Sequence, residues 1–458
     1  MGYSGERSAR FAYFSTLAAS ITAFATGMCY AWTSPILPKL QSSDSDLNPL
    51  AEPVSTSESA WIVAAMSLGL LCGPALTIFS LKFYTKKIAL LLSIAPIFVA
   101  HAMCLVIFKP NIIILARFFM GVGTGAVWSV LGGFIAEISE DKNRGLLGSI
   151  PGVMSNLGGL LVFVVGPVIQ IRYFTLVLLG PLMIFYILFG FFVPDSPYDL
   201  LVGNRHEEAE MSLKKLRGSN NVEKELAFMK DTIDSTDEDR VTLSAFFKER
   251  GLRKALMICV VLMVFQQLSG ILAVVSYAQT IFSLAGDSIS STLSVILLGI
   301  VGTVANIISS ILVDKMGRKM LLTSSCIAEA LSLFTLGVYF YMLKAGVDVS
   351  ALSWVPIASL MVFMAFFNIG LGIVPWIVAG ELFHTSVKAI ASTAISLSNF
   401  LTSFLVTIAF PYMVGNLGMG WTFMTFAMTM ILGAIFCLLV LPETKGKNFQ
   451  DIQKLLKE

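Results

Sequence analysis

The sequence predicts an all-α membrane protein with twelve transmembrane helices in two six-helix halves. Hydrophobic residues make up 56% of the 458 residues and charged residues only 13%, whereas about a quarter of a soluble domain is charged. Twelve apolar stretches are each long enough to cross about 30 Å of hydrocarbon as a helix. A hydrophilic segment, 195–252, separates the first six stretches from the last six.

The apolar stretches divide the chain into segments with different expected roles. In the first half they cover 11–35, 59–80, 87–108, 111–135, 146–170 and 174–193. In the second half they cover 255–283, 289–313, 319–342, 353–379, 388–412 and 421–441. We expect a first half at 1–194, a cytoplasmic linker with short amphipathic helices at 195–252, a second half at 253–442 and a cytoplasmic tail at 443–458. Within the linker, the polar stretch 231–240 predicts chain without regular structure.

Basic residues fall on alternate connections between the apolar stretches. Lys82, Lys86, Lys87 and Arg144 lie on the same side as the linker and the tail, whereas the connection 41–58 on the opposite side is acidic. The positive-inside rule therefore places both termini in the cytosol. We expect a multi-pass protein of the plasma membrane.

Composition argues against several classes of function. His101, His206 and His384 lie in three different segments, without metal-ligand spacing or a nucleophile partner. We therefore expect no catalytic residue, no metal and no cofactor. A net charge of +2 is too small to indicate a nucleic-acid partner. The expected partners are the lipid bilayer and a small solute, with one chain as the transport unit.

Polar residues in the middle of the spans mark a candidate solute site. Gln266 and Gln267 follow one another in the seventh span, beside Ser269. Amides within hydrocarbon need partners, and two adjacent long amides cannot both serve one neighbouring helix easily, so we expect this pair to bind a polar solute. Further candidates are Tyr277, Asn306, Asn368 and Asn399. Each asparagine could instead join two helices as a structural hydrogen bond.

Glycine and proline interrupt the tenth span. The stretch from Gly370 to Trp376 contains Gly372 and Pro375, and such residues loosen packing and remove a backbone donor. We expect the helix to break or bend there and Trp376 to stack on a sugar ring. The alternative is an ordinary proline kink with a packing tryptophan.

Charged residues near the ends of the spans form a second candidate set. Glu137 precedes Arg144 by seven residues, and Glu381 precedes Lys388 by seven at the corresponding place in the second half. This spacing indicates two related repeats, an architecture of rocking transporters. Ion pairs among such residues would close the inner side, although the charges could only set topology at the lipid headgroups. The predicted inner gate consists of Arg117, Glu137, Arg144, Asp314, Arg318, Glu381 and Lys388.

Acidic residues are scarce within the spans. The first span, Phe11–Pro35, has no Asp or Glu. Glu329 is the only carboxylate that we expect well inside any span. Proton coupling generally needs an intramembrane carboxylate on the transport path. Uncoupled movement of the solute is the simpler interpretation.

Seven motifs in order resemble the sugar porters of the major facilitator superfamily, across essentially the whole chain. They are Arg117–Gly121, Glu137–Gly148, Pro194–Pro197, Gln266–Ile271, Asp314–Lys319, Pro375–Glu381 and Pro442–Gly446. Ala31–Pro35 and Arg144–Pro151 look most like the insect branch of facilitated trehalose and hexose transporters.

The resemblance implies roles for the candidate residues. Gln266, Gln267 and Asn399 would hydrogen-bond sugar hydroxyls, Trp376 would line the cavity below them, and the charged set would form the inner gate. The hexose-carrier pattern is lost where this chain has Gly152, Leu272, Gly302, Asn368 and Phe400. Each change removes a hydrogen-bonding group or a charge. Each lost hydrogen bond should weaken discrimination between sugars by about 0.5–1.5 kcal/mol, so the changes argue against simple D-glucose specificity.

Two asparagines could replace the lost groups. Asn156 and Asn306 lie four residues beyond Gly152 and Gly302, about 5.4 Å farther along the same helix face, so they could lengthen the site for a disaccharide. In the first-half gate, Lys82 stands where the family has Asp, which predicts a less stable outward-facing state.

Three functions remain open from the sequence. The first is a facilitative transporter of trehalose or a hexose by alternating access. The second is a sugar-binding nutrient sensor with little transport, and the third is a carrier of a less polar solute.

Overall fold

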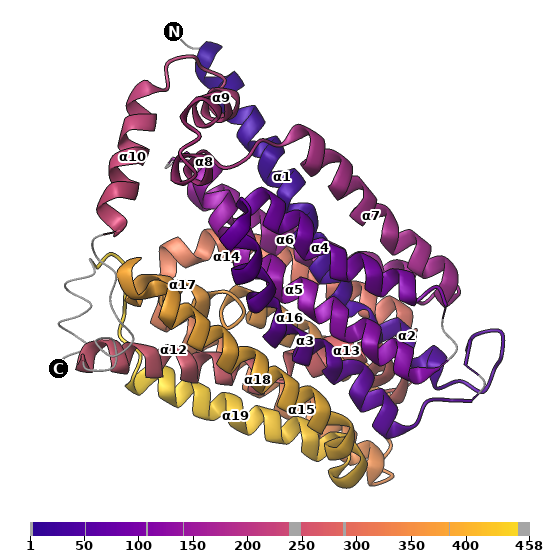
Figure 1. Cartoon of the computed structure of the whole chain (residues 1–458). Coiled ribbons are helices and arrows are strands. Elements are labelled where there is room, and N and C mark those ends of the chain that lie inside the picture. The colour runs from indigo at the N-terminus through magenta and orange to yellow at the C-terminus, as the bar shows by residue number, and fades with distance from the viewer. Residues whose placement is uncertain are drawn as a thin grey trace. The chain divides into compact units, whose positions relative to one another are not determined.

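The chain forms helices and no strand in the part that the computed structural model describes (Figure 1). The described backbone covers residues 3–447 except 51, 107–108, 141, 238–248, 287–289 and 384. Side chains are also left undescribed at 3–9, 234–237, 314, 385–386 and 388–389. Twelve helices in the described ranges are long and apolar enough to cross a membrane, as the sequence predicts.

The helices follow the predicted order of six spans, a linker and six spans. The first half contains α1 (Tyr3–Ala31), α2 (Thr33–Leu40), α3 (Thr56–Phe83), α4 (Lys86–Met103), α5 (Pro110–Ile138), α6 (Arg144–Val165) and α7 (Ile171–Phe192). The linker contains α8 (Pro197–Val202), α9 (His206–Arg217) and α10 (Glu223–Asp237). The second half contains α12 (Arg250–Leu268), α13 (Ile271–Leu284), α14 (Ser291–Met316), α15 (Arg318–Lys344), the 3₁₀ turn η1 (Ser350–Leu352), α16 (Val355–Ile369), α17 (Val374–Leu382), α18 (Thr385–Leu417) and α19 (Met419–Leu439).

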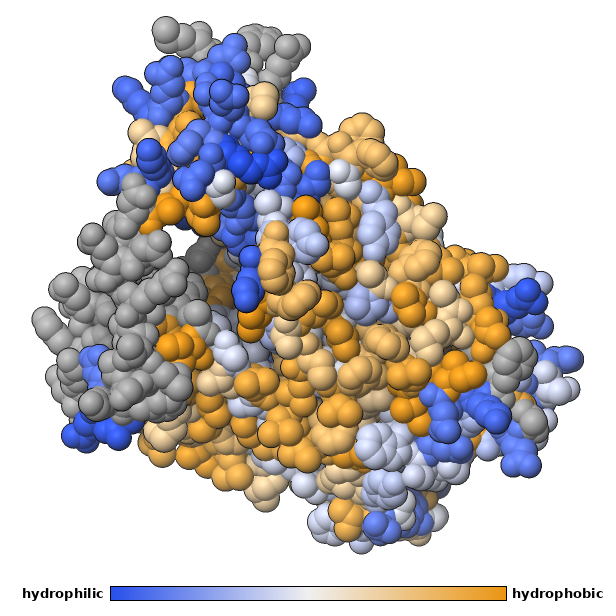
Figure 2. Space-filling model, in the orientation of Figure 1, coloured by the Kyte–Doolittle hydropathy of each residue, from blue (hydrophilic) through white to orange (hydrophobic). Residues whose placement is uncertain are grey.

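The surface differs between the spans and the linker. Large apolar side chains such as Phe191, Leu439 and Val168 are more than 70% exposed, as expected for helices that face lipid rather than water. Figure 2 shows hydrophobic side chains over most of the visible face of the spans, and hydrophilic ones gathered over α8, α9 and α10.

Two compact units make up the chain. Unit 1 contains Met1–Cys29, Leu68–Gly159 and Ile169–Arg240, and unit 2 contains Tyr30–Ser67, Leu160–Val168 and Val241–Glu458. Unit 2 therefore includes α2 as well as the second half. Within it α2 packs against α13, and the backbone nitrogen of Gln279 donates to Ser34 Oγ at 3.2 Å.

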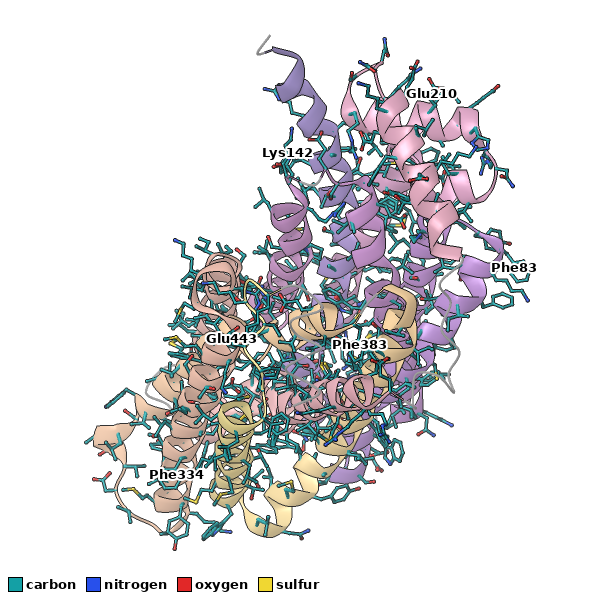
Figure 3. The ribbon with its side chains drawn as sticks, turned by 90° about the vertical axis from the view of Figure 1, so that its left-hand side faces the viewer. Phe83, Lys142, Glu210, Phe334, Phe383 and Glu443 are labelled. Atoms are coloured by element: carbon teal, nitrogen blue, oxygen red, sulfur yellow. The ribbon has the colours of Figure 1, made fainter. Side chains whose placement is uncertain are left out.

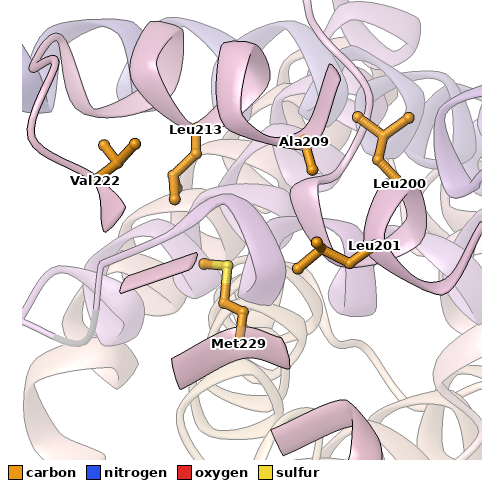
Figure 4. Close-up of a cluster of buried hydrophobic side chains, with 6 residues drawn as sticks. All are labelled: Leu200, Leu201, Ala209, Leu213, Val222 and Met229. Carbon is orange, nitrogen blue, oxygen red and sulfur yellow. The ribbon is translucent and has the colours of Figure 1, made fainter. Parts of the chain in front are cut away.

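The linker helices share a small apolar core in unit 1. Its buried members are Leu200 and Leu201 of α8, Ala209 and Leu213 of α9, Val222, and Met229 of α10 (Figure 4). Ile233 packs against this core, so α10 continues to Asp237. The prediction of irregular chain at 231–240 is therefore wrong for 231–237, because apolar positions at helical spacing still meet the cluster.

Two spans of unit 2 are interrupted. The tenth breaks between Ile369 and Val374, where the glycines and the proline predict it. The seventh also breaks, between α12 and α13, which the sequence analysis did not predict. Gly270 takes φ +80° there, and a Cβ at this residue would come 2.7 Å from the ring of Phe426. A left-handed conformation against an aromatic ring requires glycine.

Candidate functional site

Three side-chain amides come together within unit 2. Asn399 of α18 donates from Nδ2 to Gln266 Oε1 at 2.7 Å, and Gln267 donates from Nε2 to Asn399 Oδ1 at 3.1 Å. Both glutamines lie in the last turn of α12, and all three side chains are more than nine-tenths buried. The three amides that the sequence singles out are thus one connected cluster.

Carbonyl groups of the interrupted tenth span anchor this cluster. In a continuous helix Leu371 O would accept from the backbone nitrogen four residues on, but that residue is Pro375, which has no N–H. Gln266 supplies the missing donor, since its Nε2 lies 2.7 Å from Leu371 O and 3.0 Å from Gly372 O. The proline of one span therefore explains why the glutamine of another is needed.

These carbonyls determine how all three amides are turned. A carbonyl only accepts, so the amide NH₂ of Gln266 must face Leu371 and Gly372. Gln266 Oε1 then faces Asn399, which must donate from Nδ2 and present Oδ1 to Gln267. Gln267 donates in turn from Nε2, which leaves its Oε1 as the acceptor at the end of the chain.

The Oε1 atom of Gln267 is buried and has no hydrogen-bond partner among the described residues. A buried acceptor without a donor carries a desolvation penalty of about 1–3 kcal/mol. A solute hydroxyl that donates to this atom would remove the penalty. The cluster therefore ends in an acceptor that is free to take a hydrogen bond, and a role in solute binding remains a prediction.

The other predicted ligand residues of unit 2 lie on separate helices. Tyr277 of α13 packs against Phe410, with ring centroids 5.0 Å apart. Asn306 of α14 is buried, and Trp376 of α17 is 40% exposed. Their contact with a solute remains a prediction.

Two further asparagines bond within their own helices. Asn368 of α16 donates to Met364 O at 2.9 Å, and Asn156 of α6 donates to Gly152 O at 3.0 Å. Asn156 belongs to unit 1, so its role beside the amides of unit 2 remains a prediction.

A charged cluster joins α15, α17 and the segment after α19. Arg318 donates to Glu381 Oε1 from Nη2 at 2.8 Å and from Nε at 3.1 Å. Thr444 donates to Glu381 Oε2 at 2.6 Å. Two of the predicted gate residues are therefore an ion pair, and the segment after the last span joins them.

The carboxylate of Glu443, which is labelled in Figure 3, caps the N-terminus of α15. Its Oε1 accepts from the backbone nitrogen of Arg318 at 3.0 Å and its Oε2 from that of Lys319 at 3.1 Å. Burial raises the pKa of Glu443, but hydrogen bonds from backbone N–H groups outweigh burial and lower the pKa overall. A negative charge at this helix end is also favoured by the helix dipole.

Unit 1 has a comparable cluster around Glu137. Lys86, the first residue of α4, lies with Nζ 2.7 Å from Glu137 Oε1 and also pairs with Asp199 of α8. Ser196 donates to Glu137 Oε2 at 2.5 Å. The cluster therefore joins the start of α4, the end of α5 and the segment after α7.

The structure contradicts the placement of Arg117 in the inner gate. Glu137 lies twenty residues farther along the same continuous helix, α5, which separates the two backbones by about 30 Å. Arg117 is 1% exposed and donates from Nη1 to Cys29 O at 2.6 Å. The motif around Arg117 predicts membership of a family, and it was wrong to take its charge as part of the same cluster.

Three remaining gate residues stay predictions. Arg144 is exposed at the start of α6. The side chains of Asp314 and Lys388 lie outside the described residues.

Five residues of these clusters were missing from the predicted gate: Lys86, Ser196, Asp199, Glu443 and Thr444. Lys86 begins the third span of its half, as Arg318 does in the other half, and the remaining four follow the sixth span of their halves. The motifs at 194–197 and 442–446 could have indicated these residues, because both motifs place acidic residues next to the end of a span. Sequence alone did not show that the segment after each sixth span contacts the third span of the same half.

Comparison with known proteins gives concordant matches. A model of the sugar (and other) transporter family matches residues 11–456. The chain is 33% identical over 415 residues to the facilitated trehalose transporter Tret1 of Bombyx mori. The aligned region covers 88% of this chain and 80% of the relative. It is 31% identical over 441 residues to Tret1 of Anopheles gambiae. That aligned region covers 96% of this chain and 55% of the relative.

Solved structures match over nearly the whole chain. The xylose transporter XylE from E. coli, in a partially occluded inward open conformation, has a TM-score of 0.79 at 23% identity over 96% of this chain and 100% of that one. Its inward open conformation has a TM-score of 0.78 at 23% identity over 96% and 98%. These likenesses confirm the predicted fold class.

Proposed function

Because the chain belongs to the sugar (and other) transporter family of the major facilitator superfamily, we propose that it is a facilitative transporter of trehalose or a hexose. The sugar moves down its gradient by alternating access, without coupling to an ion. The protein lies in the plasma membrane with both termini in the cytosol.

The observation that carries this proposal is the oriented amide chain that ends at Gln267. A sugar presents hydroxyl groups, each of which can donate one hydrogen and accept others. One hydroxyl donates to the partnerless Oε1 of Gln267. Binding then replaces a penalty with a hydrogen bond, which favours a polyhydroxylated solute over an apolar one.

Trehalose is supported by the relatives and by the losses in the hexose pattern. The two insect relatives compared above are facilitated trehalose transporters. In unit 2, Gly302 leaves room where hexose carriers have an amide side chain, and Asn306 stands one turn farther along. A longer site of this kind suits two linked rings.

Uncoupled transport is supported by the distribution of acids. The first span has no carboxylate between Phe11 and Pro35. Glu329 is fully buried in α15, where it does not touch the amide chain directly. No described carboxylate is therefore placed to exchange a proton with solvent and contact the sugar in turn.

The two charged clusters are proposed to keep each unit rigid while the inner side opens and closes. Lys86 with Glu137 and Arg318 with Glu381 occupy equivalent places in the two repeats. Each fixes the helix ends of its own unit, so that the unit moves as one body during alternating access.

Uptake of labelled trehalose and labelled glucose into proteoliposomes tests the proposal. Wild-type protein should transport at least one of them with saturation. Gln267→Leu should weaken sugar binding by about twofold to tenfold, the effect of one lost hydrogen bond. Binding of both sugars without uptake would identify a sensor, and binding of neither would reject the proposed function. Unchanged binding by Gln267→Leu would reject the assignment of Gln267.

A further inference from the structure

The buried carboxyl group of Glu329 is not used by the transport steps proposed above. It lies in α15 at 0% exposure and forms no ion pair within the described ranges. Its titratable neighbour is the thiol of Cys326 on the same helix, which in turn contacts Cys437 of α19. An ionised carboxylate at such a place would need a cation or several donors to offset its desolvation.

Ser325 is the polar group that Glu329 contacts. Ser325 Oγ lies 2.7 Å from Glu329 Oε1, 2.8 Å from Phe366 O and 3.0 Å from the backbone nitrogen of Leu371. The N–H of Leu371 can only donate, and Phe366 O can only accept. The Ser325 hydroxyl has a single hydrogen, so it cannot donate to both Phe366 and Glu329.

Counting hydrogens distinguishes the two protonation states of Glu329. If Glu329 is ionised, Ser325 donates to it, and Ser325 Oγ then faces Phe366 O at 2.8 Å without a hydrogen between the two oxygens. If Glu329 is a neutral acid, its O–H donates to Ser325, which donates to Phe366 O while accepting from Leu371. Only the neutral acid gives every one of these contacts its own hydrogen.

We propose that Glu329 is held as a neutral carboxylic acid and that it positions the solute-binding amides through Ser325 and the interrupted tenth span. Leu371 is the connecting residue. Its N–H donates to Ser325 Oγ at 3.0 Å, and its carbonyl accepts from Gln266 at 2.7 Å. The proton on Glu329 thus fixes Ser325, which accepts from the N–H of Leu371, and the carbonyl of the same Leu371 orients Gln266.

Close packing makes this connection stiff. A Cβ on Gly370 would lie 2.4 Å from Ser325 Cβ and 2.8 Å from Leu321 O, so the interrupted backbone lies directly against α15. Side chains at such a contact have little room to shift. A change of hydrogen bonding at Glu329 therefore reaches Gln266 through only two intervening residues.

The effect on sugar affinity rests on the proposed function, but the protonation of Glu329 does not. Infrared spectroscopy of the purified full-length protein without sugar tests the protonation. The carbonyl band of a protonated carboxylic acid should be present in wild type and should disappear in Glu329→Gln. A difference spectrum that shows loss of a carboxylate band instead would overturn the proposal.

Positioning is tested with Glu329→Leu and Ser325→Ala. Hydrogen–deuterium exchange of peptides that cover Gly370–Ile373 should be faster than in wild type, whether or not sugar is present. Glu329→Gln should keep slow exchange, since its amide N–H can donate to Ser325 as the acid does. The matched control is Ser324→Ala, because Ser324 donates only to Leu321 O of its own helix.

Sugar affinity provides the functional comparison. Glu329→Leu and Ser325→Ala should weaken binding by about threefold to tenfold, with the maximal transport rate less affected, whereas Glu329→Gln and Ser324→Ala should bind like wild type. Gel filtration and thermal unfolding exclude misfolded variants. If Glu329→Leu has the exchange rate and sugar affinity of wild type, Glu329 does not position the amides. If wild type fails to bind sugar, the proposed function is rejected, while the infrared result on the protonation of Glu329 is unaffected.

Discussion

Gln266 donates its side-chain amide to the backbone carbonyl of Leu371, 2.7 Å away across two interrupted spans. The contact exists because Pro375 cannot donate to that carbonyl. It stabilises the break and at the same time orients the amides that end at Gln267. If the amides bind the solute as proposed, Gln266 serves both stability and binding, and a comparison of the two glutamines separates the two effects.

Gln266→Leu should lower both thermal stability and sugar affinity. The carbonyls of Leu371 and Gly372 lose their donor, and leaving a buried acceptor unsatisfied costs about 1–3 kcal/mol. Thermal unfolding in detergent and equilibrium sugar binding measure the two effects. The control is Gln267→Leu, which keeps the contact with Leu371 and should lose affinity with a smaller change in Tm. Equal losses of Tm would show that the break does not depend on Gln266.

Glu443→Gln should destabilise the protein in a pH-dependent way. The folded-state pKa of Glu443 is lowered from its ordinary value of 4.5, so its carboxylate contributes stability above that value. The contribution is lost as the pH falls through the folded pKa. The difference in Tm between wild type and Glu443→Gln should have its largest value near about pH 7 and become smaller below about pH 4.5. A difference that grows on acidification would contradict the assigned hydrogen bonds.

Gly270→Ala should destabilise the interrupted seventh span. A left-handed φ costs a residue with a Cβ about 1–2 kcal/mol, and the new methyl group would meet the Phe426 ring at 2.7 Å. Gly346→Ala is the matched control, because Gly346 has φ +77° and nothing within 4 Å of its added Cβ. Thermal unfolding should show a larger loss for Gly270→Ala, and equal losses would mean that the ring contact adds nothing.

Arg217→Leu should release the linker helices from α5. Arg217 donates to Ile138 O at 2.8 Å and pairs with Glu225 at 2.7 Å, with only 7% of its side chain exposed. Losing such charge-assisted bonds removes about 1.5–3 kcal/mol. Limited proteolysis of the linker should be faster in this variant.

The control for the linker is Lys214→Leu. Lys214 pairs with Glu210 on the exposed face of α9 at 2.6 Å, and such a pair contributes about 0.3–0.5 kcal/mol. Proteolysis should then resemble that of wild type. If both variants are cleaved at the same rate, Arg217 does not hold the linker in place.

The sequence was sufficient for the spans and for the identity of the central amides. Long apolar stretches can be counted because hydrocarbon requires each of them to satisfy its own backbone. Gln266, Gln267 and Asn399 stood out because polar groups in such stretches are rare. The break of the tenth span followed from its glycines and Pro375.

Tertiary contacts were beyond the sequence. The break at Gly270 depends on the ring of Phe426, which comes from α19 far along the chain. Glu443 and Thr444 became part of a charged cluster only because the segment after α19 returns to the start of α15. Arg117 was misplaced because its charge was assigned to the inner end of the span, whereas it lies twenty residues before Glu137 on the continuous helix α5.

Counterflow in proteoliposomes tests whether the protein carries sugar by alternating access without a proton gradient. Vesicles loaded with unlabelled trehalose or glucose are diluted into a trace of the labelled sugar, with and without a protonophore. An uncoupled transporter should give transient accumulation of label by the wild type for at least one sugar, weaker accumulation by Gln267→Leu, and no effect of the protonophore. Binding without accumulation, or accumulation that requires a proton gradient, would contradict uncoupled transport.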